Sequence, residues 1–590
     1  MSDITGKIKK SMGNARKKKR YPAARLGDRL GERLSVYVGW FVLAIFTIHP
    51  LMIRLPRKVV DTITNDETGA VEEFVRYVGN GYTNITETKG TTFIVILLCA
   101  VFLMLCAVAY TLMLGHTPKL RLKERLRSLR PYEIAILAYW LIALVSACTS
   151  ENLHTAFMGA SLRNEGFWFQ TAYIAAFLMV ARWYKPKTRD FVVLICTAIL
   201  IAFYILPQYY GYDLLHFYPN ELPPRSKIMF IGTMSNINVA STYYGIVFVI
   251  CSVLFVQHTS DKLRRFLFPC ALLLFYIVLL GDTESVQVGL IAVVMVAFPF
   301  VAKDKKTIAR TLLLGAGCAL VGWINMVAHR AYFLGDPQFA VLEPLLPIVA
   351  GVFAALAALV RFLPIKKGLP AMVWRVGWLT MVVVILVGAV LAMPILAEKT
   401  GNRSLQEAAS VLKGNFDPNF GSKRFLAWGR AIDMFKQKPI LGHGPDNFGH
   451  IYTNTFTLPE YQELLAEAAA KGIDPSTVDN PTTFDKAHNE YFQALVDVGI
   501  LGLAAILVFY GLLLYAVFRR HLNNPVVLAL GVALGCFLVQ AFFNFSTPFA
   551  HPVTWTCWGM LAAAMRNAGV DVEGEAPAVV VGKKKVVSKS

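Results

Sequence analysis

A histidine that could act as a base lies where a polar segment enters a long apolar one. The run Asp485-Lys486-Ala487-His488-Asn489-Glu490 leads directly into the apolar block at 491–517. Asp485 has the residue type of a helix N-cap, which would put His488 in the first helical turn. A helix N-terminus attracts phosphate, and its field keeps an imidazole neutral and able to accept a proton. The alternative is a histidine that only caps the helix or sits at a membrane interface.

The element that would carry this histidine is one of many apolar blocks. The chain has 590 residues, of which 56% are hydrophobic and only 16% charged, whereas an ordinary soluble domain carries about 25% charged residues. This composition excludes a disordered chain, a disulfide-rich secreted module and a typical cytosolic enzyme. About fourteen blocks approach the length that crosses a bilayer, near 35–54, 92–114, 132–148, 168–182, 191–207, 235–257, 267–281, 285–302, 311–328, 344–363, 376–396, 491–517, 525–545 and 553–566.

Basic residues give these blocks an orientation. The formal net charge is +20, and Lys and Arg favour cytoplasmic loops. With a cytoplasmic N-terminus, every connection expected inside is basic, whereas segment 397–489 holds ten Lys/Arg and eleven Asp/Glu, a net charge of −1. We therefore predict a basic cytoplasmic arm at 1–34, a transmembrane bundle at 35–396, an extracytoplasmic segment with the candidate site at 397–489, C-terminal transmembrane helices at 490–567 and a cytoplasmic tail at 568–590.

The location of the charge argues against nucleic acid as a partner. Eight of the first twenty residues are Lys or Arg, and no apolar core or cleavage site directly follows them. We expect this arm to be solvated near anionic lipids rather than to be a secretory signal peptide. The nine cysteines form no C-x-x-C pair, so neither a disulfide framework nor a zinc site is indicated.

Segment 397–489 has the pattern of a mainly helical unit. Helical spacing is present at 404–412, from Ser422 to Lys438, and at 461–471. Before the third of these, Gly442-His443-Gly444-Pro445 predicts a tight turn because two glycines flank the histidine.

Groups of residues within and around this segment resemble a known family. Within it and at its end they are Ser422, Lys423, Arg424 and Trp428, then Pro439, Ile440, Leu441, Gly442, Gly444 and Phe448, then His488, Asn489, Phe492, Gly499, Ile500 and Gly502. Similar patches occur at 163–167, at 232–241 and at Asn544, Pro548, Pro552 and Trp558. Over roughly residues 150–565 their order resembles the O-antigen ligase / O-antigen polymerase superfamily of bacterial membrane glycosyltransferases. The expected fold is then an all-α, polytopic transmembrane helical bundle of about fourteen spans with a large, mainly helical extracytoplasmic loop, GT-C-like.

The resemblance implies a reaction and a set of site residues. A glycan would move from a polyprenyl-pyrophosphate donor, such as undecaprenyl pyrophosphate, to an acceptor hydroxyl on a glycan, lipid or cell-envelope molecule. The site would lie on the outer face of the bacterial cytoplasmic membrane, and the transfer would be inverting and independent of metals or other cofactors. His488 matches the base, and Arg424, Arg163 and Arg225 match the arginines that hold the donor pyrophosphate. The expected supporting residues are Asn489, Trp428, Lys227 and Asn238.

Elementary chemistry agrees with these roles. Breaking the anomeric C–O bond leaves charge on the pyrophosphate, and a guanidinium fork suits phosphate geometry and stays charged. Arg163 and Arg225 lie in connections expected at the outer interface, where an exposed charge needs a partner. The alternative for each arginine is an ordinary contact with a lipid headgroup.

The chain also departs from the family. Many relatives have a Ser-Arg pair where this chain has 281–287, without arginine. Lys227 or Arg330 could supply the missing cation. In the same stretch, Asp282 and Glu284 resemble the paired acids that hold a divalent metal in other polyprenyl-dependent transferases, which leaves metal binding open. His443 and His450 are loop histidines and would be the alternative bases.

Two other functions share these features. A polymerase of lipid-linked repeat units would use the same donor with a second donor as acceptor. A transporter or flippase for lipid-linked glycans would have the same helix count and basic inner loops, but it would be expected to bury charged groups near the middle of its spans. Here the apolar blocks are almost free of charged residues, which favours the transferase.

Overall fold

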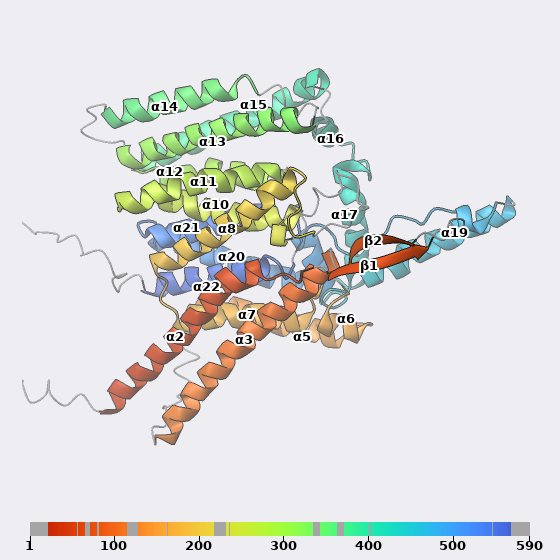
Figure 1. Ribbon diagram of the computed structural model, residues 1–590, viewed down its shortest axis with the longest axis horizontal. Helices are drawn as coiled ribbons and strands as arrows, with labels where there is room; N and C mark the ends of the chain where they lie inside the picture. The colour runs from red at the N-terminus through yellow and green to blue at the C-terminus, as the bar shows by residue number, and fades with distance from the viewer. Residues whose placement is uncertain are drawn as a thin grey trace, which may run out of the picture.

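The computed structural model describes most of the chain as one helical bundle with an elaborated end (Figure 1). The described residues are 22–55, 57–64, 71–78, 82–114, 128–161, 163–216, 232–234, 237–281, 283–333, 343–362, 371–400, 403–471, 473–545 and 547–567.

Fourteen helices of the described residues build the bundle. They are α2 (Pro22–Leu51), α3 (Tyr82–Met113), α5 (Pro131–Cys148), α7 (Phe167–Trp183), α8 (Thr188–Tyr209), α10 (Ile237–Gln257), α11 (Asp261–Leu280), α12 (Glu284–Val301), α13 (Lys305–Phe333), α14 (Leu346–Phe362), α15 (Ala371–Thr400), α20 (Glu490–Arg520), α21 (Pro525–Gln540) and α22 (His551–Asn567). Each predicted apolar block coincides with one of them, because a continuous apolar run satisfies its backbone hydrogen bonds within a helix.

Length and composition show a polytopic membrane protein. In the part of the chain that the structure describes, ten helices are long and apolar enough to cross a membrane, namely α2, α3, α5, α8, α10, α11, α12, α13, α15 and α20. Helices α14 and α21 are apolar but shorter. The all-α polytopic fold is thus confirmed, whereas the total of fourteen spans and the GT-C-like arrangement stay predictions.

The basic connections gather at one end of the bundle. Arg566, at the end of α22, donates to the carbonyl of Arg182 (2.7 Å), and Arg182 donates to Glu133 at the start of α5 (2.6 Å). Lys303, just after α12, donates to the carbonyl of Leu522, just after α20. Figure 1 places the start of α2 and the end of α22 toward this same end. The described parts of the connections that we predict to be cytoplasmic therefore lie together, opposite segment 397–489.

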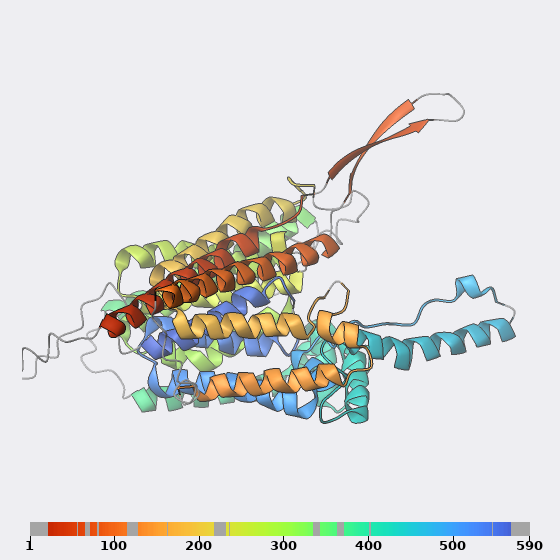
Figure 2. The same cartoon turned by 90° about the horizontal axis from the view of Figure 1, so that it is seen from below.

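The opposite end carries the helices of segment 397–489. These are α16 (Arg403–Leu412), α17 (Phe420–Gln437), α18 (Phe448–Tyr452), the π-helix η3 (Thr453–Thr457), α19 (Leu458–Ala470) and the short 3-10 helix η4 (Pro475–Thr477). The three helices expected here are present as α16, α17 and α19. Residues 421–423 have positive φ, so the regular part of α17 begins only at Arg424. Helix α19 projects well beyond the bundle (Figures 1 and 2).

The predicted tight turn packs directly on α20. Gly442 and Gly444 have φ of 72° and 101°. The N–H groups of His443 and Gly444 donate to the carbonyls of Val496 (2.8 Å) and Asp497 (2.9 Å). At Gly499, which interrupts α20 with φ 65°, a Cβ atom would lie 2.3 Å from the carbonyl oxygen of Ile440. The absence of side chains at these glycines allows the two backbones to meet.

A β-hairpin was not anticipated from the sequence. Strands β1 (Arg57–Thr64) and β2 (Val71–Val78) pair antiparallel, with Arg57 opposite Val78 and Thr64 opposite Val71. The hairpin extends from the bundle on the side of segment 397–489 (Figure 2). It adds a small β element to a fold that we expected to be entirely helical.

The core lies around α10, α21 and α22. In the 18-residue apolar stretch of each helix, 94% of the residues of α10 are buried, whereas only 6% of those of α15 are. Helices α13, α14 and α15 form an outer layer at one side of the bundle (Figure 1). The remaining short elements are α6 (Leu153–Met158) and η1 (Gly232–Met234). Helix α10 is thus a central support, whereas α15 is peripheral.

Candidate functional site

His488 lies immediately before α20 rather than in its first turn. Asn489 is the N-cap, and its side-chain oxygen accepts from the N–H groups of Tyr491 (2.9 Å) and Phe492 (3.1 Å). The prediction of Asp485 as the cap was therefore wrong. His488 has φ 51°, a left-handed conformation that is incompatible with the helix.

The surroundings of His488 are aromatic and cationic. Its ring meets that of Phe545 edge to face, with centroids 4.8 Å apart, and that of Phe484 at 6.4 Å. The pKa of His488 is lowered from 6.5 to about 4, mainly by burial; Asp485 opposes this shift, and the positive charges of Arg424 and Arg163 add to it. The imidazole is therefore neutral at pH 7, as expected, although burial rather than a helix N-terminus is the main cause.

Arg163 packs its guanidinium over the ring of Phe545, the same ring that His488 meets edge to face. It comes from the loop between α6 and α7, and its guanidinium carbon is 4.7 Å from the centroid of Phe545. Its Nε donates to Oδ2 of Asp485 (2.6 Å), and its Nη2 forms an ion pair with the same oxygen. Arg163 is only 14% exposed, whereas Asp485 is 51% exposed. The structure thus brings Arg163 and His488 together around one aromatic ring.

Arg424 approaches from the first regular turn of α17. Burial lowers its pKa, and Glu284 at the start of α12 opposes this shift. Glu284 in turn accepts a hydrogen bond from Ser404 on α16 (2.6 Å). The positive charge of Arg424, like that of Arg163 from a different segment, lowers the pKa of His488.

Trp428 fixes the segment that carries His488. Its indole N–H donates to the carbonyl of Ala487 (3.1 Å), the residue directly before the histidine. Its ring stacks on Phe492 at 5.7 Å and meets Phe542 edge to face at 5.4 Å. The supporting position predicted for Trp428 therefore has a physical basis, because the side chain ties α17 to the start of α20.

The other predicted residues are distributed differently. The carbonyl of Asn238 accepts from the side chain of Asn544 (3.0 Å), next to Phe545 in the chain. Arg225, Lys227 and Asp282 lie outside the described residues. Arg330 pairs with Glu343 (2.7 Å) just before α14.

The two other histidines of this segment have local partners. The ring of His443 is buried and its Nε2 lies 2.9 Å from the carbonyl oxygen of Met434. Nε2 of His450 lies 3.1 Å from the side-chain nitrogen of Asn454. His443 therefore holds the turn against α17. Within the described residues, no cluster of three or more His, Cys, Asp or Glu could hold a metal ion.

Beneath the site lies a buried charged network that the sequence analysis missed. Lys486 and Asp446 form an ion pair in which both side chains are nearly inaccessible. Burial by itself would lower the pKa of Lys486, but the carboxylates of Asp446, Asp497 and Glu165 raise it above its ordinary value. Burial raises the pKa of Glu165 well above its usual range, and Lys486 opposes this shift.

This network connects three segments. Oδ2 of Asp446 accepts from the N–H groups of Ala160 (2.7 Å) and Glu165 (3.0 Å), in the loop that carries Arg163. Both carboxylate oxygens of Asp497 accept from the side chain of Gln493 (3.0 Å each). A charge inside the apolar block 491–517 was the signal that could have revealed the network, because a charge at membrane depth needs a partner.

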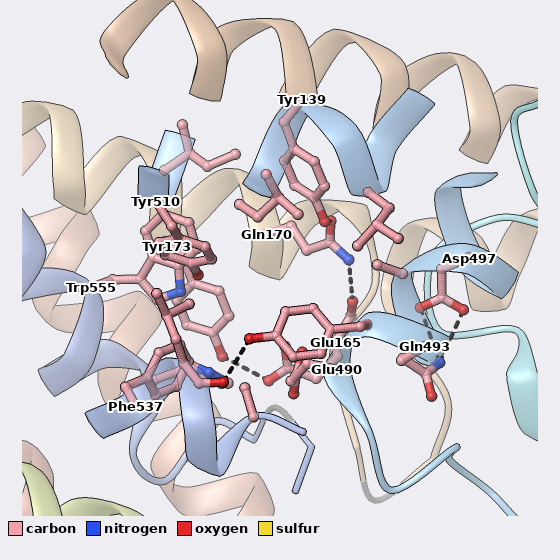
Figure 3. Close-up of a pocket in the computed structure, with 18 of the residues that line it drawn as sticks. Tyr139, Glu165, Gln170, Tyr173, Glu490, Gln493, Asp497, Tyr510, Phe537 and Trp555 are labelled. Carbon is pink, nitrogen blue, oxygen red and sulfur yellow. Dashed lines mark hydrogen bonds between the residues drawn. The ribbon is translucent and has the colours of Figure 1, made fainter. Parts of the chain in front are cut away.

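A cavity of about 100 Å³ adjoins the network. Its polar lining includes Glu165, Gln493 and Asp497, and its apolar lining consists of aromatic and aliphatic side chains of α5, α7, α20, α21 and α22 (Figure 3). Tyr173 donates to Glu165 (2.9 Å) across it. A polar pocket, and not a fully apolar core, therefore lies beside the network next to the candidate site.

A comparison with protein families gives a match over the part of the chain that holds most of this site. Residues 345–507 match the family model described as O-Antigen ligase, a stretch that includes Arg424, Trp428 and His488 but not Arg163. No curated protein matches the chain. At the coarse level, the family implies a membrane enzyme of the glycosyltransferase type that handles lipid-linked glycans and polysaccharide acceptors. Residues 345–507 are thus similar to the O-antigen ligase family, which supports the resemblance to the O-antigen ligase/polymerase superfamily.

Proposed function

We propose that this protein transfers a glycan from a polyprenyl-pyrophosphate donor to an acceptor hydroxyl, with His488 as the base and Arg163 and Arg424 as donor contacts. The observation that carries the proposal is a neutral imidazole close to two guanidinium groups at one end of a membrane bundle. The site falls largely in the stretch that matches the O-antigen ligase family. Arg225 and Lys227 remain further candidates for donor binding.

The proposed reaction is a single displacement. The acceptor hydroxyl gives its proton to the imidazole of His488 while its oxygen attacks the anomeric carbon. The bond from that carbon to the pyrophosphate oxygen breaks, and its electron pair stays on the polyprenyl diphosphate. Two guanidinium groups stabilise this charge in a site with little water, where fixed cations act most strongly. Attack opposite the leaving group inverts the anomeric configuration.

Donor binding should also prepare the base. An imidazole with a pKa of about 4 is a weak proton acceptor. The negative charge of a diphosphate next to Arg163 and Arg424 would offset the two cations that lower this pKa. His488 then becomes more basic only when the donor is present, which protects the site against unproductive protonation.

The orientation follows from the distribution of charge. Basic connections favour the cytoplasmic side, and they lie at the end of the bundle opposite α16–α19. We therefore propose that His488 faces the extracytoplasmic side of the bacterial cytoplasmic membrane, where a lipid-linked glycan would reach it from the outer leaflet.

The decisive experiment measures transfer by the purified protein in nanodiscs, with a defined lipid-pyrophosphate glycan and several acceptors. His488→Ala should abolish product while donor binding persists, and His450→Ala, at a histidine of α18, is the matched control. Arg424→Ala should raise the KM for the donor more than that for the acceptor. Normal turnover by His488→Ala would refute the assignment of the base.

The same assay separates the alternatives. Products that lengthen with donor alone would identify a polymerase. Movement of intact donor across the bilayer of sealed proteoliposomes, without cleavage, would identify a transporter. Addition of a chelator tests metal independence. The test is needed because Glu284, one of the two acids that resemble a metal-binding pair, lies near Arg424. Full activity in the chelator is expected.

A further inference from the structure

A second polar cavity lies at the opposite end of the bundle from His488, between α11, α13 and α14. It has a volume of about 550 Å³. Its polar wall contains four basic side chains and one acid, and its remaining wall consists of small or apolar side chains. The basic members are Arg264, Lys306, Arg310 and Arg361. With Asp261 as the one carboxylate, the formal charge of the lining is +3.

Two of the arginines are held in place by the end of α10. Arg264 donates to the carbonyls of His258 (2.7 Å) and Thr259 (2.6 Å), and Arg310 donates to the carbonyl of Val256 (2.7 Å). Carbonyl oxygens orient a guanidinium without neutralising it. Asp261 neutralises only Arg264, with which it forms an ion pair. The carboxylate of Asp304 acts on Arg310 from nearby, but among the described residues it forms no ion pair with it. The charge on Arg310 is therefore fixed in direction and available to an anion.

The other two cations complete the wall from different helices. Lys306 lies in the first turn of α13 and Arg361 in the last turn of α14. Both residues are exposed. A ligand would thus meet two fixed and two adjustable cations from three helices, an arrangement that suits several oxygen atoms on one phosphate.

The remaining wall is suited to a hydrocarbon chain. Toward the middle of the bundle the cavity is lined by small or apolar residues of α13 and α14, namely Ala309, Leu313, Ala354, Ala357 and Ala358. The neighbouring residue Leu359 of α14 is 54% exposed, which is typical of a lipid-facing surface. The cavity is therefore charged at the helix ends and apolar farther along the helices.

We propose that this cavity binds an anionic phospholipid, with its phosphate on the four basic side chains and an acyl chain along α13 and α14. Helices α11 and α13 are candidate membrane spans, so the cations lie at the depth where headgroups occur, and basic pockets between such helices suit anionic headgroups. A free phosphate would use the same cations but would leave the apolar wall uncovered. This site is independent of the proposed transfer reaction.

The test measures lipid binding to the full-length protein in detergent by native mass spectrometry. Phosphatidylglycerol, phosphatidylcholine and inorganic phosphate serve as separate probes. We expect phosphatidylglycerol to bind at the lowest concentration. The double variant Lys306→Gln/Arg361→Gln should weaken its binding, by roughly fivefold for each cation removed. These exposed residues are chosen so that the fold persists, which circular dichroism and thermal unfolding without lipid verify.

The matched control is Arg519→Gln/Arg520→Gln, which removes two exposed cations at the same end of the bundle but outside the cavity. It should retain wild-type affinity. An equal loss in both variants would mean a general attraction of the basic end and would overturn the proposal. Binding of inorganic phosphate at least as tight as that of phosphatidylglycerol would overturn it in favour of a site for a free anion. Unchanged affinity in the cavity variant would also overturn it.

Discussion

The ion pair between Arg163 and Asp485 predicts a gain in donor affinity on removal of the acid. If Arg163 binds the donor pyrophosphate, the phosphate must compete with Asp485 for the guanidinium. In Asp485→Asn the charge of this competitor is lost. Since Asp485 is 51% exposed and is not the cap of α20, the fold should not change.

The magnitude follows from the exposure of the pair. A hydrogen bond between charged groups contributes about 1.5–3 kcal/mol when protected from water, and an exposed ion pair at most about 1 kcal/mol. Arg163 is 14% and Asp485 51% exposed, so we take about 1 kcal/mol. This corresponds to a roughly fivefold lower KM for the donor. His488 remains neutral in this variant, but the loss of Asp485 lowers its pKa further, so the rate at saturating donor should not rise.

Initial rates over a donor titration at fixed acceptor measure this effect. The matched control is Asp479→Asn, which removes an exposed acid from the same connection before α20. A donor KM that is unchanged or higher in Asp485→Asn would refute the reasoning. It would show that Asp485 positions Arg163 rather than competing for it.

Three further predictions concern the same site. In the proposed mechanism the neutral form of His488 is the active one, so kcat/KM should not change with its titration between pH 6 and 8 and should fall as the pH drops through about 4. Bound diphosphate should move the acid limb of the kcat profile to higher pH, by on the order of two pH units for one charge about 6 Å away. Trp428→Phe keeps the stacking on Phe492 but removes the hydrogen bond to the carbonyl of Ala487, so kcat should fall roughly fivefold to tenfold. The control Trp374→Phe removes a similar hydrogen bond, to the carbonyl of Ala302 at the other end of the bundle, and should leave kcat unchanged. Asp446→Asn leaves Lys486 without its buried partner and should lower the free energy of unfolding by about 3–5 kcal/mol, which denaturant or thermal unfolding would measure.

The lowered pKa of His488 has a second consequence, for stability. The unfolded chain takes up a proton near the ordinary value of 6.5, whereas the folded chain does so only near 4. The unfolded state therefore binds more protons between these values, and the free energy of unfolding falls as the pH drops from 6.5 to 4. His488→Gln should reduce this dependence.

Most of the bundle could be predicted because hydropathy is a local property. Each apolar block became a helix, and the glycines at 442 and 444 identified the turn on which α20 rests. The hairpin of β1 and β2 was missed because its strands lie between the first two apolar blocks, where the search for spans gave no signal.

The start of α20 could not be predicted locally because tertiary contacts decide it. Both Asp485 and Asn489 have cap-forming side chains. The side chain of Gln493 accepts from the N–H of Ala487 (3.0 Å), and the N–H of Glu490 donates to the carbonyl of Ala541 (2.8 Å). These bonds hold the chain before Asn489 outside the helix, and they leave His488 in its left-handed conformation.

One carboxylate explains why two residues far apart in sequence face each other. Oδ1 of Asp446 pairs with Lys486, two residues before His488, and Oδ2 binds the backbone of Ala160, three residues before Arg163. Ala160 and Asp446 are 286 positions apart, so no local pattern could reveal this connection. Because the pair is buried, a shift of either segment would expose an unbalanced charge to an apolar environment. The proposed base and the proposed donor contact are therefore positioned by the same group, and damage at Asp446 should reduce both donor affinity and turnover, whereas Asp485→Asn should strengthen donor binding without raising turnover.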